Sequence, residues 1–364
     1  MSVKVGLLTW TMLSLELNEQ TAQAYEQLGM DSVWVLDHLL GVVHPELWKE
    51  SPASALLADP DAFLDPFCVA AAVARKVDMI VGSSVIDITR RRAADFARSA
   101  LTVHLASRKG FIFGVGSGLT LNLEPYGYET KRRVSKFEET LRELRMLFDT
   151  GRMPHGIGRI GLPLESTAGR PQLWVAAHGP RMREITGRYA DGWMTSGVAV
   201  EQFAKDRSEV LRAAEKYGRP APVCCFAPFL FFGESRTAIK AKLDAAPLAK
   251  LILLFAPASL WKRYGLEHPT GPDAAGYTDA VPHAHNAQKL RETAARIPFE
   301  MFDEFVISGN ADEISARLEP FVDAGAGHII LSDVAGLAVS AQEAASAFPQ
   351  YSQVRERLRA REPR

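Results

Sequence analysis

The chain has 364 residues, of which 47% are hydrophobic and 23% are charged, an ordinary composition for a globular protein. Its 42 lysines and arginines nearly balance its 43 aspartates and glutamates, leaving a net charge of −1. This balance argues against a nucleic-acid-binding surface or a polybasic membrane surface. No apolar run approaches the roughly 18 residues that a transmembrane helix needs.

The three cysteines are Cys68, Cys224 and Cys225, an odd count that includes an adjacent pair. This pattern fits neither a disulfide framework nor a cysteine-based zinc site, and it indicates a reduced chain in the cytoplasm. Residues 4–24 loosely imitate a secretion signal, but two glutamates interrupt that segment. A strand is the better prediction for its first part.

In the first half of the chain, short apolar runs alternate with helical patterns. The pattern predicts strands at 3–10, 32–37, 79–86 and 111–116 and helices at 18–29, 66–75, 93–104 and 134–148. Asn18 is the expected N-cap of the first helix. A loop at 39–64 contains three prolines, and loops of that length are usually functional or disordered.

The second half repeats the alternation, with larger interruptions. The pattern predicts strands at 173–177, 192–196, 222–232 and 328–332, and a short extra strand at 305–308. Pro180 suits the first position of a helix, and Asn310 with Glu313 resembles a capping box. Residues 149–172 are a Gly- and Pro-rich insertion, whereas 236–303 is mostly helical with a break at 265–282. A charged helix closes the chain.

Eight main strands that alternate with helices predict an α/β fold, a single (β/α)8 TIM barrel over residues 1–364. The insertions are the loop 39–64, the segment 149–172 and the helical segment 236–303. The alternative is a doubly wound open sheet. It is less favoured because no Gly-x-Gly-x-x-Gly follows the first strand.

Active sites of such barrels lie at the carboxyl ends of the strands. Four of these ends carry Asp37-His38, Gly82-Ser83-Ser84-Val85, Gly114-Val115-Gly116-Ser117-Gly118 and Ala176-Ala177-His178-Gly179-Pro180-Arg181. Their small residues leave room for a flat ligand against the backbone, and the helix start at the last one is a candidate anion site. The pattern therefore favours a planar cofactor with a phosphate tail.

Ordinary structural roles compete with this interpretation. Asp37 could cap a helix, His38 could be a loop histidine, and the glycines could simply turn the chain. His283-Ala284-His285 has the His-x-His spacing of some metallohydrolases, but it lies in an insertion away from the first strand. We expect no metal site. Cys224 and Cys225 are expected to be buried, inert thiols.

One stretch is specific enough to suggest a family. Residues 174–182 (WVAAHGPRM) and 187–193 (GRYADGW) resemble the luciferase-like superfamily of flavin- and deazaflavin-dependent oxidoreductases. Within it, the chain resembles most the mycobacterial phthiodiolone and phenolphthiodiolone dimycocerosate ketoreductases. Residues 124–127 (EPYG) and 265–269 (GLEHP) of this chain also match that group. The resemblance implies the deazaflavin coenzyme F420, with FMN as the alternative.

The resemblance also implies roles for individual residues. Asp37 and His38 match a pair beside the reactive ring carbon, and Ser84-Val85, next to Ser83, match a bulge with a non-proline cis peptide behind the ring. The other matching positions hold the ring, the ribityl chain or the phosphate; they are Ser117, Gly118, Asn122, Ala176, Ala177, His178, Gly179, Pro180 and Arg181. Several deazaflavin relatives have a glutamate where this chain has Leu119.

These inferences predict a reductase that passes a hydride from the deazaflavin to a carbonyl, imine or similar group of a small-molecule or lipid substrate. His38 is the expected proton donor because Leu119 cannot replace the missing acid, and Asp37 would orient His38 or stabilise its charge. Trp10 and Trp48 are candidate pocket residues, and a homodimer is expected. The alternatives are an FMN-dependent monooxygenase of the same fold and a non-catalytic flavin-binding relative or metallohydrolase.

Overall fold

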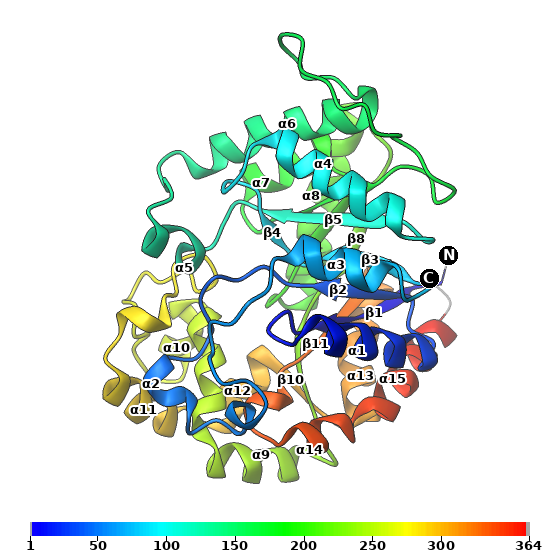
Figure 1. Cartoon of the computed structure of the whole chain (residues 1–364). Helices are drawn as coiled ribbons and strands as arrows, with labels where there is room; N and C mark the ends of the chain where they lie inside the picture. Colours follow the sequence, from blue (N-terminus) through cyan, green and yellow to red (C-terminus); the bar gives the residue numbers. More distant parts are fainter. Residues whose placement is uncertain (1, 362–364) are drawn as a thin grey trace.

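Eight parallel strands close into a barrel in the computed structural model, which describes residues 2–361 (Figure 1). The strands are β1 (Lys4–Thr9), β2 (Ser32–Val35), β3 (Ile80–Ser83), β5 (Phe111–Gly116), β6 (Gln172–Ala176), β7 (Gly192–Thr195), β8 (Val223–Phe226) and β11 (His328–Asp333). Pairing of β1 with β11, in register from Lys4 with His328 to Leu7 with Leu331, closes the ring. The predicted TIM barrel is thus confirmed, and the open sheet is excluded.

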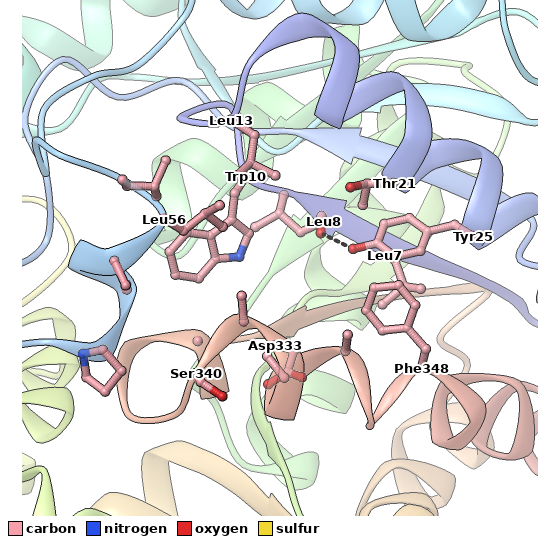
Figure 2. Close-up of a pocket in the computed structure, with 18 of the residues that line it drawn as sticks. Leu7, Leu8, Trp10, Leu13, Thr21, Tyr25, Leu56, Asp333, Ser340 and Phe348 are labelled. Carbon is pink, nitrogen blue, oxygen red and sulfur yellow. Dashed lines mark hydrogen bonds between the residues drawn. The ribbon is translucent and has the colours of Figure 1, made fainter.

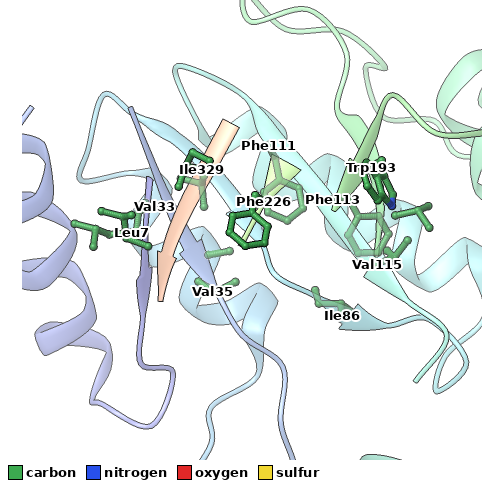
Figure 3. Close-up of a cluster of buried hydrophobic side chains, with 14 of the residues drawn as sticks. Leu7, Val33, Val35, Ile86, Phe111, Phe113, Val115, Trp193, Phe226 and Ile329 are labelled. Carbon is green, nitrogen blue, oxygen red and sulfur yellow. The ribbon is translucent and has the colours of Figure 1, made fainter. Parts of the chain in front are cut away.

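Amphipathic helices cover the outside of the barrel because alternate strand residues point outward and are apolar. Figure 3 shows part of this buried layer, with Leu7, Val33, Phe113 and Ile329 beneath the helices. The main outer helices are α1 (Leu15–Gln27), α3 (Pro66–Ala74), α4 (Ala93–Ala106), α6 (Arg133–Thr150), α7 (Pro180–Tyr189), α8 (Val200–Lys216), α13 (Ala311–Asp323) and α15 (Phe348–Ala360). Within residues 2–361, no helix is long and apolar enough to cross a membrane.

Local signals at the helix ends are partly as predicted. Pro180 is the first residue of α7, and Asn310 and Glu313 form the capping box of α13. The first helix is a correction, because Ser14 caps it by accepting a bond from the N–H of Leu17 (3.2 Å). Asn18 lies inside that helix, and its amide is fully buried beneath β1. A buried amide needs hydrogen-bond partners, and Asn18 Oδ1 accepts a hydrogen bond from the Thr9 hydroxyl (2.8 Å).

Two predicted strands are each divided in the structure. The segment 79–86 becomes β3 and β4 (Ile86–Asp87), separated by a cis peptide bond between Ser84 and Val85. The segment 222–232 becomes β8 and β9 (Phe229–Phe232), because Pro228 has no N–H to continue the ladder. β9 pairs with β11 and with the predicted extra strand, β10 (Val306–Gly309).

The two long insertions pack on one another at one end of the barrel (Figure 1). Segment 39–64 contains α2 (Pro45–Trp48) and η1 (Pro52–Ala55), and the segment from 236 onward contains α9 (Arg236–Ala245), η3 (Pro247–Phe255), α10 (Ala258–Arg263), η4 (Pro282–Ala284), α11 (Ala287–Arg296) and α12 (Phe299–Phe305). Their apolar side chains form a second core. The remaining short elements are α5 (Thr120–Leu123), η2 (Glu124–Tyr126), η5 (Ala335–Leu337) and α14 (Ala341–Ala345).

Two indoles lie in the barrel interior, packed with Ile112, Met194, Cys225 and Ile330. Trp34 and Trp174 lie 5.5 Å apart between ring centroids, and both contact the edge of the buried His328 ring. A Cβ at Gly82 would meet the Trp34 ring at 2.4 Å, and a Cβ at Gly192 would meet the Trp174 ring at 2.5 Å. Gly82 therefore makes room for an indole within the barrel rather than for a ligand at its mouth, which corrects the interpretation drawn from its small size.

Candidate active site

The residues expected at the site follow four consecutive strands of the barrel. Because β2, β3, β5 and β6 are neighbours in the closed sheet, their carboxyl ends share one side of the barrel mouth. The N–H of Ser84 donates to the carbonyl of Val35 (2.8 Å), which ties the second and third strand ends together. Val85 packs close to Gly116, where an added Cβ would lie 2.9 Å from Val85 Cγ2. The fold thus brings together segments that are far apart in sequence.

Asp37 lies beneath this surface and is only 3% exposed. Its carboxylate forms an ion pair with Arg90, and Oδ2 also accepts from the backbone N–H of Asp87 (3.1 Å). These bonds run toward β4 and not to the neighbouring His38 ring. Asp37 thus acts on His38 through its charge, which raises the pKa of the ring, and not through a hydrogen bond; its own partner is Arg90, which the sequence did not single out.

Asn122 holds the segment after β2 in place. Its Oδ1 accepts from the N–H of Leu39 (2.8 Å), and its Nδ2 donates to the carbonyl of Asp37 (3.0 Å) and to Asp87 Oδ2 (2.8 Å). The side chain is fully buried. In this arrangement Asn122 positions the backbone on both sides of His38, whereas the resemblance implied a direct contact with the cofactor.

Asp87 completes a buried network with Asp37, Arg90 and Asn122. The pKa of the Asp87 carboxyl is raised to about 7, first by burial and then by the nearby Asp37 carboxylate. The hydrogen bond from Asn122 and the charge of Arg90 lower this pKa but do not offset the rise. Asp87 ends β4, and Arg90 begins a run of three arginines three residues further along the chain. That charged strand end was the sequence signal by which both residues could have been found.

His38 is half-buried at the strand end, and its ring stacks on Phe63 with 5.4 Å between centroids. Nδ1 lies 3.2 Å from the carbonyl oxygen of Leu40. A carbonyl only accepts, so Nδ1 carries the proton and Nε2 is the free nitrogen. Burial lowers the pKa of the His38 imidazole, with smaller opposing effects from the Leu40 carbonyl and Asp37. The neutral ring therefore presents an unprotonated Nε2.

The bulge after β3 provides a small, partly exposed surface. Ser84 and Val85 are half-buried, and the cis bond between them agrees with the feature that the resemblance implied. Ser83 is fully buried, where its hydroxyl donates to the carbonyl of Gly114 (2.9 Å). Ser83 thus supports the bulge from behind. On the next strand end, Ser117 is half-buried and Gly118 has a φ of 103°, a conformation that favours glycine.

The helix start after β6 is open to a ligand. Gly179 is the N-cap of α7, no side chain caps this end, and an added Cβ at Gly179 would meet no atom within 4 Å. Pro180 at the next position lacks an N–H, so the free donors of the first turn come from residues 181 and 182. These amides and the helix dipole favour an anion.

The side chains around this helix start have separate roles. The Arg181 guanidinium bonds to Ser135 (3.1 Å) and approaches Glu138 (3.4 Å), so it reaches α6 rather than the free amides. The exposed His178 ring stacks on Tyr277 of the insertion, 6.2 Å away. Ala176 is half-buried and Ala177 buried at the end of β6. The structure thus places 176–180 at the mouth, with the Arg181 side chain directed to a neighbouring helix.

The two tryptophans expected to line a substrate pocket lie in different environments. Trp10 is half-buried and lines a cavity of about 350 Å³ (Figure 2). Trp48 is buried in the insertion core, with its indole N–H bonded to the carbonyl of Leu57 (2.7 Å), and it does not line that cavity. None of the strand-end residues from Asp37 to Arg181 described above lines the cavity either.

No cluster of three metal-binding side chains is present among residues 2–361. His283 instead bonds through Nε2 to the carboxylate of Asp61 (3.0 Å), which links the two insertions. Cys224 and Cys225 are buried as expected, and burial raises the pKa of both thiols.

A family model described as luciferase-like monooxygenase matches residues 7–328. The chain belongs to this luciferase-like family. Phthiodiolone/phenolphthiodiolone dimycocerosates ketoreductase from Mycobacterium kansasii is 30% identical over 342 residues, which cover 90% of this luciferase-like chain and 93% of the relative. The protein of that name from Mycobacterium tuberculosis is 31% identical, covering 84% of each chain. A 5,10-methylenetetrahydromethanopterin reductase from Methanolobus tindarius is 22% identical, covering 86% and 89%.

Solved structures share the fold of this luciferase-like enzyme. An F420-dependent secondary alcohol dehydrogenase, solved with an F420–acetone adduct, has a TM-score of 0.71 at 18% identity, covering 99% of this chain and all of that one. An F420-dependent tetrahydromethanopterin reductase from Methanopyrus kandleri also scores 0.71, at 14% identity and 97% and 98% coverage. A monooxygenase from Streptomyces bottropensis scores 0.66 at 16% identity, covering 96% and 98%. The family model and the ketoreductase relatives identify the chain as an enzyme, an oxidoreductase of the luciferase-like family.

Proposed function

We propose that this enzyme is a coenzyme F420-dependent oxidoreductase that transfers a hydride between the deazaflavin and a carbonyl, imine or similar group, with ketone reduction as the favoured reaction. The name of the relatives, ketoreductase, supports the substrate class, and the deazaflavin follows from the family resemblance. The observation that carries the proposal is the half-buried His38 after β2, with the Ser84–Val85 bulge after the neighbouring strand β3.

The residues at the mouth fit such a coenzyme. The uncapped start of α7 and the empty space at Gly179 suit a phosphate, and the bulge offers small side chains to a flat ring. When bound, the deazaflavin supplies a ring carbon that gives or accepts a hydride. Residues 176–182 would hold the phosphate, with the free N–H groups of residues 181 and 182 as donors, whereas Ser84, Val85, Ser117 and Gly118 would hold the ring and ribityl chain.

His38 moves the proton that accompanies the hydride. In ketone reduction the carbonyl carbon gains the hydride, and the oxygen takes a proton from Nε2 of the protonated ring. In the reverse direction, the neutral Nε2 takes the proton of the alcohol. The bond from Nδ1 to the Leu40 carbonyl fixes the ring so that the same nitrogen serves both directions. The lowered pKa of His38 favours the neutral form and hence alcohol oxidation as pH rises.

The cofactor test is a titration of the purified chain with F420 and, separately, with FMN, read by absorbance and protein fluorescence. We expect F420 to bind with micromolar affinity and FMN to bind at least tenfold more weakly. Reduced F420 should then be oxidised when a ketone is added. Tight FMN binding without any response to F420 would overturn the proposal.

The second candidate is an FMN-dependent monooxygenase. The family model carries that activity in its description, and a solved monooxygenase shares the fold. Oxygen consumption by the FMN-loaded protein in the presence of a reductant would favour it.

We also propose a homodimer in the cytoplasm. Light scattering tests the oligomeric state, and cell fractionation tests the location.

A further inference from the structure

A cavity separate from the strand-end residues of the candidate site lies on the side of the barrel formed by its first and last strands. It has a volume of about 350 Å³, within the usual range of small-molecule pockets. Its walls come from the end of β1, from α1, from the segment 52–57 and from the segment between β11 and α15. Figure 2 shows Trp10 at its centre, with Leu56 on one side and Tyr25 and Phe348 on the other.

The lining is mostly apolar, with Thr21, Ser340 and Asp333 among its polar residues. Leu8, Leu13, Trp10 and Phe348 surround most of the space, and Leu56 at its edge is 52% exposed, which is unusual for a large apolar side chain. The cavity is partly open to solvent, and a ligand that fills it removes apolar side chains from water, which is favourable. Filling the cavity would also remove the Leu56 side chain from solvent.

The one carboxyl group among the lining residues belongs to Asp333. This residue ends β11 and is half-buried, with Oδ2 accepting from the Tyr351 hydroxyl (2.7 Å) and Oδ1 accepting from the N–H of Ala335 (2.9 Å). The backbone N–H of Phe232 also faces this carboxyl. A carboxylate has about four acceptor sites, so one further hydrogen bond is available to a ligand in the cavity. The bonds to Tyr351 and Ala335 fix the carboxyl in one orientation.

We propose that this cavity binds a small, neutral, mainly apolar molecule with a single hydroxyl group, such as a medium-chain aliphatic alcohol, whose hydroxyl meets Asp333 and whose chain lies along Trp10. At about 30 Å³ of liquid volume per water molecule, the space corresponds to roughly a dozen non-hydrogen atoms. The proposal does not depend on the coenzyme, because the cavity lining contains none of the proposed coenzyme-binding residues.

The protonation of Asp333 favours a hydroxyl over a charged group. Burial raises the pKa of the Asp333 carboxyl to about 6, so both its forms are populated near neutral pH. A hydroxyl donates to the carboxylate and accepts from the acid, so it pairs with either form. A ligand carboxylate would be repelled by the ionised form, and an ammonium group would pay a large desolvation cost among the leucines.

The test is a calorimetric titration of the full chain, without coenzyme, using a series of 1-alkanols from butanol to tetradecanol. We expect one site per chain. Affinity should rise about fourfold per methylene, since burying a CH₂ is worth about 0.8 kcal/mol. The rise should stop near a dozen non-hydrogen atoms, when the cavity is full. A series that rises without a break, or octylamine or octanoate binding more tightly than 1-octanol, would overturn the proposal.

A matched pair of variants locates the site. A Cβ at Gly336 would contact the Trp10 ring at 3.8 Å, an ordinary distance, so G336L fills the cavity without a backbone clash. G161L is the control, because Gly161 is exposed and only Arg159 lies nearby, at 3.7 Å. We expect G336L to weaken 1-octanol binding at least tenfold and G161L to leave it unchanged. Equal binding by both variants would overturn the proposal, and the chain-length series on the unmodified protein decides the question if G336L fails to fold.

Discussion

Arg90 and Asp37 form a buried ion pair. It holds the Asp37 carboxylate, which precedes His38 in the chain, on the β4 side of the barrel. The guanidinium side chain is only 10% exposed and the carboxylate 2%. Because Asp87 also lies in this network, one arginine balances two buried carboxyl groups. The position of the His38 segment therefore depends on a charged pair beneath it, together with the amide of Asn122.

Replacing Arg90 should destabilise the fold. R90M leaves Asp37 and Asp87 buried without their cation, and breaking such a pair costs about 3–5 kcal/mol. Urea unfolding measures the change. The matched control is R291M, whose ion pair with Glu50 is solvent-exposed and should contribute little to stability. Equal losses in the two variants would show that the Arg90 pair is not buried in solution.

The pH dependence of stability should change when Asp87 is replaced. Its folded pKa of about 7 lies above its ordinary value of 3.8, so the folded chain binds more protons than the unfolded chain between those values. Through this group alone, stability is greatest at low pH and falls as pH rises from about 4 to 7. D87N should remove that fall, which is at most about 1.4 kcal/mol per pH unit. The measurement compares D87N with the unmodified protein at each pH; parallel curves would contradict the raised pKa.

Replacing His38 separates proton transfer from cofactor binding. H38A should lower turnover by about 10²–10⁴-fold, the usual contribution of a general acid, and leave F420 affinity nearly unchanged. In the unmodified enzyme, the single-turnover rate of ketone reduction should fall as pH rises through the lowered His38 pKa, because the protonated form is lost. If H38A loses F420 affinity while its rate at saturating coenzyme persists, His38 packs against the ring and transfers no proton.

The phosphate site is tested at Gly179. Its φ of −85° and ψ of 156° suit a β-branched residue, and the space around it is empty, so G179V should fold normally. The added side chain would occupy the space in front of the free amides and weaken F420 at least tenfold. G161V is the control at an exposed glycine without coenzyme contacts. A lowered melting temperature in G179V alone would indicate a structural role instead.

Local patterns in the sequence determined the elements and the fold class. Alternating apolar strands and amphipathic helices identified the barrel, because each element needs an apolar face against the layer beside it. Pro180 and the Asn310–Glu313 box marked two helix starts, since their effects depend only on neighbouring residues. The strand-end rule also indicated His38 and the segment after β6, because parallel strands place their carboxyl ends at one edge.

The tertiary structure alone decided which partner each polar group has. Asp37 pairs with Arg90 and Asn122 bonds on both sides of His38, contacts that join residues 53 to 85 positions apart. Gly82 leaves space for the indole of Trp34 on the neighbouring strand, and Trp48 packs inside the insertion core. Such contacts depend on distance in space, which local pattern does not encode. For the same reason the cavity beside Asp333, built from both ends of the chain, exists only once the barrel has closed.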